Sequence, residues 1–349
     1  MGMVDLRSDT VTRPTAAMLS AMAGATVGDD VLGDDPTVQE LEEFGAELMG
    51  KDAGLFLPSG TMSNNVAIAA LTRPGDEALL DWDAHSLRHE CGAPAVLSGV
   101  VLRQYRSDTG IPRVSEIESA IQSETLHAPG TRLILLENTH NASGGTVIPL
   151  AVHRRIFDVA RDADVSVHLD GARLFNAAVA AETAVVEYAR FADTVTFCLS
   201  KGLGCPVGSV LTGNAETIDR ARRLRKRFGG GLRQAGFLAA AGLYALRHHR
   251  DRLVDDHRRA RVLAEHLAEL SGIQVDLKSV QTNMVYFETT GSAKVWVDAL
   301  AREGVACLAL GEHRIRMVTH LDISDVGIDH AIEATRKIDR LLSSTGASQ

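Results

Sequence analysis

Cysteine is scarce in this 349-residue sequence, and its four cysteines form no C-x-x-C pair. The scarcity argues against a disulfide-stapled fold, and we expect Cys91, Cys198, Cys205 and Cys307 to be reduced and mostly buried. The N-terminal MGMVDLRSDT has no apolar signal segment, and position six is Leu6 rather than the Ser or Thr of a myristoylation motif. These absences predict a cytoplasmic protein.

Long hydrophobic runs and a surplus of positive charge are also missing. No apolar run approaches the length that spans a membrane. Lys and Arg number 36 against 45 Asp and Glu, and the formal net charge of −9 argues against nucleic acid or an anionic membrane as the main partner. Hydrophobic residues make up 45% and charged residues 23%, as in ordinary globular proteins, and the length suits a large domain plus a small one.

Short apolar runs alternate with helical segments in the middle of the chain. Three runs rich in β-branched residues cover 132–138, 165–170 and 194–200. A helical segment lies between the first two, and the stretch after Gly171 has room for another. This alternation predicts an α/β fold with a mostly parallel sheet, in which a ligand binds beyond the carboxyl ends of the strands.

The flanking segments extend this pattern in both directions. A helix is expected from Pro36, capped by Asp35 and stopped at Gly50. A strand, a tight turn and a helix follow over 53–71, and a further strand runs from 77 to His85.

The C-terminal third predicts a second, smaller unit. Residues 233–270 have the apolar spacing of a long helical connection. From Gly272 onward, four apolar runs alternate with helical pieces, which predicts a smaller α/β unit.

Chemically active side chains follow each central run. His140 comes after the first run, Asp170 and Arg173 after the second, and Lys201 after the third. A lysine at the end of a buried strand is partly desolvated, which suits a Schiff base with a carbonyl group, although lysine at a strand end is more often simply exposed. The neighbouring glycines leave room for a flat ring.

Asp170 fits the acid that keeps a pyridinium nitrogen protonated, although it could instead cap the next helix. Arg173, three residues later, could bind a carboxylate in a bidentate fork. Ser59, Gly60 and Thr61 lie at the predicted strand-to-helix turn, where free N–H groups favour a phosphate or simply cap the helix.

Position at a strand end singles out His85 and His140 from 13 histidines as candidates for stacking or proton transfer. His248, His249 and His257 are interpreted as a solvated helix face, and so are most members of the basic run 220–228. No His/Cys cluster has the spacing of zinc ligands, so no metal is expected.

Six ordered motifs resemble the low-specificity L-threonine aldolases of the beta-eliminating lyase group, which are fold-type I pyridoxal phosphate (PLP) enzymes. They are VDLRSDTVTRP, GDDVLGDDPTV, ENTHNASGGTVIPL, HLDGARLFNA, LSKGLGCPVGSVL and GGGLRQAG, and RMVTHLD extends the resemblance nearly to the end of the chain. It implies an N-terminal arm at the active site over 1–30, a large PLP-binding domain over 31–250 and a small C-terminal domain over 251–349.

The resemblance also implies residue roles. Lys201 would carry PLP, Asp170 would hold its ring nitrogen, and His85 would stack on the ring. The remaining implied roles are carboxylate binding by Ser8, Arg173 and Arg316, phosphate binding by Gly60 and Thr61 beside Ser59, contact with the substrate hydroxyl by His140, and contact with a neighbouring subunit's site by Lys226 and Arg233. A homodimer with shared active sites, paired into a homotetramer, follows from the last role.

The implied reaction is cleavage of L-threonine or L-allo-threonine to glycine and acetaldehyde. A phenylserine-type aldolase, a transaldolase or a β-eliminating lyase on the same scaffold is the alternative. Leu32 stands where the family commonly has tyrosine, and Arg88 and His89 stand where many relatives have aromatic or aliphatic residues. These departures bear on which aldehyde is accepted.

Overall fold

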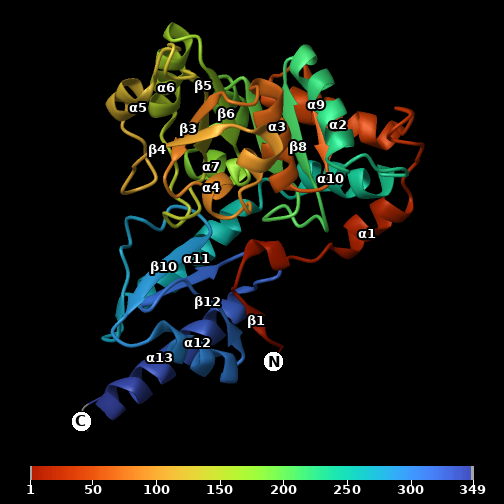
Figure 1. Ribbon diagram of the computed structural model, residues 1–349. Helices are drawn as coiled ribbons and strands as arrows, with labels where there is room; N and C mark the ends of the chain where they lie inside the picture. The colour runs from red at the N-terminus through yellow and green to blue at the C-terminus, as the bar shows by residue number, and fades with distance from the viewer. Residues whose placement is uncertain (1, 347–349) are drawn as a thin grey trace.

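The computed structural model describes residues 2–346, which form two α/β lobes joined by a helix and an N-terminal arm (Figure 1). The arm contains β1 (Val4–Asp5), the short 3-10 helix η1 (Asp9–Val11) and α1 (Ala16–Ala23). The large lobe contains α2 (Pro36–Met49), β2 (Ala53–Leu57), α3 (Gly60–Leu71), β3 (Glu77–Asp81), α4 (His85–Arg88), η2 (Pro94–Ser98), β4 (Val101–Tyr105), α5 (Val114–Ala120), β5 (Thr131–Glu137), α6 (Leu150–Asp162), β6 (Ser166–Asp170), α7 (Leu174–Ala180), α8 (Val185–Ala189), β7 (Thr194–Cys198), β8 (Ser209–Gly213), α9 (Ala215–Arg227) and α10 (Gly236–His248). The small lobe contains α11 (Leu253–Leu267), β9 (Ile273–Gln274), β10 (Met284–Thr289), α12 (Ala293–Arg302), β11 (Val305–Ala306), β12 (Leu308–Ala309), β13 (Arg314–Val318) and α13 (Asp325–Gly346).

The large lobe is built on a seven-stranded sheet in the order β2-β8-β7-β6-β5-β3-β4. Strand β8 runs antiparallel to both neighbours, and the other adjacent pairs are parallel. The predicted mostly parallel sheet is therefore confirmed. The carboxyl ends of β3, β5, β6 and β7 meet at one edge, which brings the residues that follow them close together.

The first predicted helix is confirmed at both ends. The Asp35 carboxylate accepts hydrogen bonds from the backbone N–H of Thr37 and Val38, and Pro36 is the first residue of α2. Gly50 ends the helix with a left-handed φ of 60°, a conformation that costs glycine little.

Two local predictions are wrong. The run from residue 77 does not stay extended to His85: β3 ends at Asp81, whose side chain accepts a hydrogen bond from Asp83 N and closes a turn, and His85 starts α4. The helical stretch 233–270 is two helices, α10 and α11, separated by a short turn.

The histidines assigned to a solvated face divide into two groups. His248 is exposed as predicted, but His249 is buried and its ring pairs with Leu203 O. His257 lies 3.1 Å from the Asn176 amide, and burial lowers its pKa to about 4. Asn176 belongs to α7 and His257 to α11, so the packing of these two helices encloses one ring that the arginine-rich sequence pattern placed in solvent.

Part of the basic run 220–228 is also buried. Arg225 is buried and ion-pairs with Asp30, and Arg222 pairs with Glu42. These acids come from the loop before α2 and from α2 itself, so their proximity is invisible in the local pattern.

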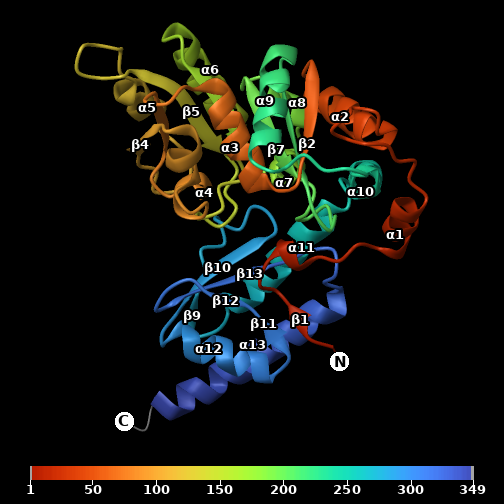
Figure 2. The ribbon, with the colours of Figure 1, turned by 45° about the vertical axis from the view of Figure 1, so that its right-hand side comes forward.

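The small lobe contains the predicted second α/β unit. Its four-stranded antiparallel sheet has the order β12-β13-β10-β9, and helices α11, α12 and α13 pack around it. Trp296, Phe287 and Leu300 are among its buried core residues. Strand β1 pairs in parallel with β11, whereas α1 packs against α10 of the large lobe, so the arm contacts both lobes (Figure 2).

All four cysteines are free thiols, and only Cys91 among them is exposed. Among the described residues, no helix combines the length and the apolar character needed to cross a membrane.

Candidate active site

Lys201 lies just beyond the carboxyl end of β7, between the neighbouring strands β6 and β8. Every residue of β7 is buried, so the strand gives the lysine a rigid base. The backbone carbonyl of Lys201 accepts a hydrogen bond from Thr12 Oγ1 at 3.1 Å, which connects the N-terminal arm to this loop. The lysine itself is partly buried at the strand edge, as its sequence context predicts.

Asp170 ends β6, next to β7, and only 4% of its surface is exposed. Its Oδ2 accepts a hydrogen bond from Asn64 Nδ2 at 2.7 Å, and its Oδ1 accepts one from Ala172 N at 3.0 Å. His168 lies beneath, against Asn64 Oδ1, and burial lowers its pKa to about 4, so this ring is neutral. Within residues 2–346, no cationic side chain forms an ion pair with Asp170, which suits a carboxylate that pairs with a cationic ring.

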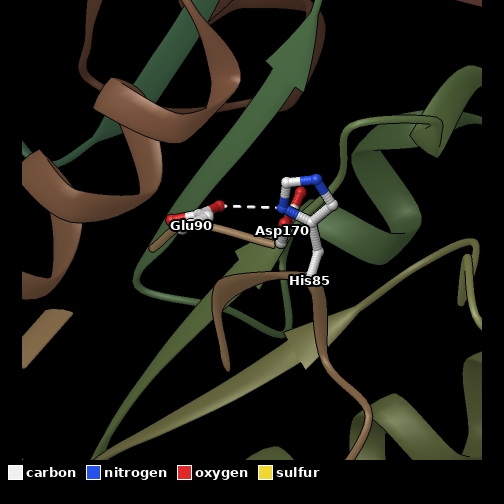
Figure 3. A group of neighbouring side chains, drawn as sticks. All are labelled: His85, Glu90 and Asp170. Atoms are coloured by element: carbon white, nitrogen blue, oxygen red, sulfur yellow. Dashed lines mark hydrogen bonds and ion pairs between the residues drawn. The ribbon is translucent and has the colours of Figure 1, made fainter. Parts of the chain in front are cut away.

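His85, Glu90 and Asp170 form a cluster at this edge (Figure 3). His85 Nδ1 lies 2.9 Å from Glu90 Oε1, and the side chain of Glu90 is fully buried. Asn64 Nδ2 donates to both Glu90 and Asp170, and Asn65 Nδ2 donates to the other oxygen of Glu90. The ligand atoms of the three residues lie within 4.8 Å of one another, close enough to hold a metal ion, but these hydrogen bonds already engage the carboxylate oxygens.

Glu90 was not identified from the sequence, although it was within reach of local reasoning. It follows His85 by five residues, just after the short helix α4, and a chain reversal there brings it back to the ring. The signal in the sequence is an acidic residue close to a candidate histidine. Its burial, which distinguishes it from other acidic residues, cannot be read from the sequence.

The electrostatics of His85 depend on Glu90. Burial alone would lower the pKa of His85, but the hydrogen bond to Glu90 and the charges of Asp170 and Glu137 outweigh burial and the opposing charge of Lys201, so the pKa is raised. The attraction between protonated His85 and these carboxylates stabilises the fold. The stabilisation is fully present below the ordinary histidine pKa and is lost as the pH rises through the raised pKa.

We predict that Glu90→Gln shifts deprotonation of His85 to lower pH. The neutral amide keeps the size of the side chain but no longer favours the imidazolium. NMR titration of the His85 ring measures the shift. Glu77→Gln, which alters another buried carboxylate at the amino end of β3, is the control and should leave the titration unchanged. An unshifted titration in Glu90→Gln would contradict this account of His85.

The three residues predicted to bind a carboxylate converge on the arm. Arg173 Nε and Nη2 each lie 2.7 Å from an oxygen of Asp9, and Arg316 Nη2 donates to Arg7 O at 3.1 Å. Ser8 lies between these two contacts and caps η1 through its Oγ. Arg173 is the non-helical residue that immediately precedes α7.

His140 lies in the loop after β5, where its backbone forms a bridge with Thr146. The ring is buried, and its Nε2 is 3.5 Å from Asp81 Oδ1; within residues 2–346 neither ring nitrogen has a hydrogen-bond partner. Burial alone would lower the pKa of His140, but Asp81 and Glu137 raise it overall. Glu137 also accepts hydrogen bonds from the backbone N–H of His85 and Asn141, so it joins the two histidine loops.

The predicted phosphate residues lie at the amino end of α3. Ser59 caps the helix by accepting a hydrogen bond from Met62 N, and Gly60 and Thr61 begin it. The first N–H groups of a helix lack intrahelical partners and favour an anion, so both the capping role and phosphate binding suit this turn.

Lys226 and Arg233 lie apart from this group. Both are exposed, Arg233 pairs with Asp29, and within the described residues neither makes a hydrogen bond or ion pair with another candidate site residue.

The three departures from the family pattern are exposed. Leu32 has 76% of its surface exposed in the loop before α2. The guanidinium of Arg88 lies 5.2 Å from the centre of the Trp82 ring, and the ring of His89 lies 5.4 Å from that of His85. Of these three residues, His89 is therefore the one whose side chain contacts a candidate site residue.

The donor set fits PLP. Lys201 supplies an amine and Asp170 a buried carboxylate without a cationic partner, on adjacent strands. His85 presents an imidazole beside Asp170, and the amino end of α3 supplies free N–H groups for a phosphate.

Comparisons with known proteins agree with this interpretation. The family model described as beta-eliminating lyase matches residues 5–290. The chain is 42% identical to the low specificity L-threonine aldolase of Escherichia coli K12 over 92% of this chain and 95% of that protein. It is 40% identical to low-specificity L-threonine aldolase 1 of Arabidopsis thaliana over 95% of each.

A solved threonine aldolase of Leishmania major superimposes with a TM-score of 0.83 at 20% identity, covering 96% of this chain and 99% of that one. The expected fold-type I architecture is thereby confirmed. With a family match over most of its length and relatives above 40% identity, this chain belongs to the beta-eliminating lyase family.

Proposed function

We propose that this protein is a PLP-dependent aldolase that cleaves L-threonine and L-allo-threonine to glycine and acetaldehyde. The observation that carries the proposal is the juxtaposition of Lys201 and Asp170 on adjacent strands, with His85 beside Asp170. The curated relatives named low-specificity L-threonine aldolases support the reaction and the substrate class.

PLP supplies a ring that accepts the electron pair released when a bond to the substrate Cα breaks. Lys201 would hold the cofactor through Nζ, and Asp170 would keep the ring nitrogen protonated. Arg173, Arg316 and Ser8 would bind the substrate carboxylate, which would fix the Cα–Cβ bond in the orientation that favours its cleavage. His85 would contact the ring.

The hydroxyl proton of the substrate must leave as the aldehyde forms. His140 and His85 are the side chains available to accept it, directly or through a water molecule. Both lie at the carboxyl edge of the sheet, in loops that Glu137 joins.

A side-by-side assay of aldehyde release tests the proposal. L-threonine, L-allo-threonine and phenylserine are offered to the PLP-loaded protein, with D-threonine as the negative control. Acetaldehyde and glycine in equal amounts from the L-substrates are expected. Ammonia and a keto acid would instead indicate a β-eliminating lyase, and a strong preference for phenylserine would indicate the phenylserine-type aldolase.

We predict that His140→Ala changes the ratio of cleavage rates for L-threonine and L-allo-threonine. These substrates differ in the direction of the β-hydroxyl, so loss of one polar partner affects them unequally. If His140 is the base, the rate also falls by roughly 10²–10⁴-fold. Replacing the exposed His127 with alanine is the control, and an unchanged ratio in His140→Ala would refute the role.

We further propose a homodimer with shared active sites, paired into a homotetramer. Lys226 and Arg233 are exposed, where a neighbouring copy could contact them, and Leu19 of α1 and Phe237 of α10 add exposed apolar surface. Analytical ultracentrifugation tests this state. The four free thiols support a cytoplasmic location, which cell fractionation tests.

A further inference from the structure

The strongest unassigned contact in the site is the buried ion pair between Asp9 and Arg173. No part of the Asp9 side chain is exposed, and 5% of the Arg173 side chain is. Both Asp9 oxygens accept hydrogen bonds of 2.7 Å, one from Nε and one from Nη2 of Arg173. This is the bidentate geometry that fixes a guanidinium in one orientation.

The pairing uses one edge of the guanidinium and leaves another available. Nε and the adjacent proton of Nη2 point at Asp9. The remaining protons are on Nη1 and on the far side of Nη2, and in the described part of the chain their one hydrogen-bond partner is Asn141 Oδ1, 3.4 Å from Nη1. A second carboxylate can therefore approach only along the Nη1–Nη2 edge.

Asp9 also lies where the arm meets both lobes. Asn283 Nδ2, just before β10, donates to Asp9 Oδ2 at 3.3 Å, and Arg316 of β13 binds the carbonyl of Arg7. Three consecutive arm residues therefore lie together at the site: Arg7 contacts Arg316, Asp9 binds Arg173, and Ser8 lies between them. Although burial alone would raise the pKa of Asp9, Arg173, with contributions from Lys201 and Asn283, lowers it to about 2. Asp9 is thus expected to be ionised at neutral pH.

We propose that Asp9 is a positioning residue that aims the free edge of Arg173 at the carboxylate of the amino-acid substrate. This deepens the proposed function by assigning a residue to its carboxylate selection. Asp9 does not touch the substrate; it acts through Arg173. The site then distinguishes an α-amino acid from a simple amine by the orientation of one guanidinium.

Binding of two probes to the PLP-loaded protein tests the proposal. Glycine carries the carboxylate, and methylamine offers the same amine without it; absorbance changes of the cofactor give both dissociation constants. Asp9→Asn should weaken glycine binding by roughly 10–100-fold, the value of one hydrogen bond to a charged group, and leave methylamine unchanged. Glu77→Gln is the matched control, because Glu77 is a buried carboxylate paired with Arg103 at the opposite edge of the sheet. It should leave both constants unchanged.

Equal weakening of glycine and methylamine by Asp9→Asn would show a general structural role and overturn the proposal, as would glycine binding within twofold of the unaltered protein. If Asp9→Asn does not fold, Asp9→Glu serves instead, because the longer side chain displaces the guanidinium while keeping the charge. Selective loss of glycine binding in Asp9→Glu supports the proposal, and normal glycine binding overturns it. Neither probe is cleaved. A protein that binds glycine in this way but releases no aldehyde would therefore refute the aldolase proposal alone.

Discussion

Replacing Lys201 with alanine is expected to remove the visible absorbance of the bound cofactor and to lower turnover by roughly 10⁴–10⁶-fold, the range found when single members of a catalytic group are lost. The alanine side chain cannot form the covalent bond to PLP that we propose for the amine. Absorbance spectra and aldehyde release measure the two effects.

Lys51→Ala is the matched control for this variant. Lys51 is also partly buried, and its Nζ donates to Ala192 O at 2.6 Å, far from the strand edge that carries Lys201. The control should keep both the absorbance and the activity. Retention of both by Lys201→Ala would disprove the assignment of the cofactor lysine.

Replacing Asp170 with alanine is expected to slow turnover by roughly 10²–10³-fold while PLP still binds. In the proposed role this buried carboxylate holds the ring nitrogen protonated, and removal of one electrostatic partner aimed at developing charge has effects of this size. Steady-state rates at saturating PLP, together with the absorbance of the bound cofactor, separate lost catalysis from lost binding.

Asp193→Ala is the control for Asp170→Ala. Asp193 lies at the amino end of β7, where it accepts a hydrogen bond from Val167 N and pairs with Arg161. This variant tests the effect of losing an aspartate contact at the other edge of the same sheet. Normal turnover by Asp170→Ala with PLP bound would exclude the pyridinium role.

Local sequence patterns were sufficient to predict the strand–helix alternation and to identify the residues that follow each strand. Runs of β-branched residues predicted β5, β6 and β7 to within two residues, because strand formation there depends on short apolar segments. Parallel strands then require Lys201 and Asp170 to meet at one edge. The resemblance added roles that spacing alone could not give to Ser8 and Arg316.

Predictions failed where contacts depend on distant segments. His249 and His257 were placed in solvent because their neighbours are arginines, but His249 is buried against the Leu203 carbonyl and His257 lies against Asn176 of α7. Arg225 was assigned to an exposed face, yet it pairs with Asp30, which is 195 residues away along the chain. A local pattern contains no information about such partners.

The sequence by itself determined the architecture and pointed to the candidate groups at the strand ends, because both follow from short-range periodicity and from the rule that parallel strands end at a common edge. Only the tertiary structure decided which carboxylate pairs with which cationic side chain. Glu90 adjoins His85 and Asp9 binds Arg173, the latter across 164 residues. The physical reason is that a buried charge must find a partner within a few ångströms, and that distance is set by the packing of the arm and the lobes.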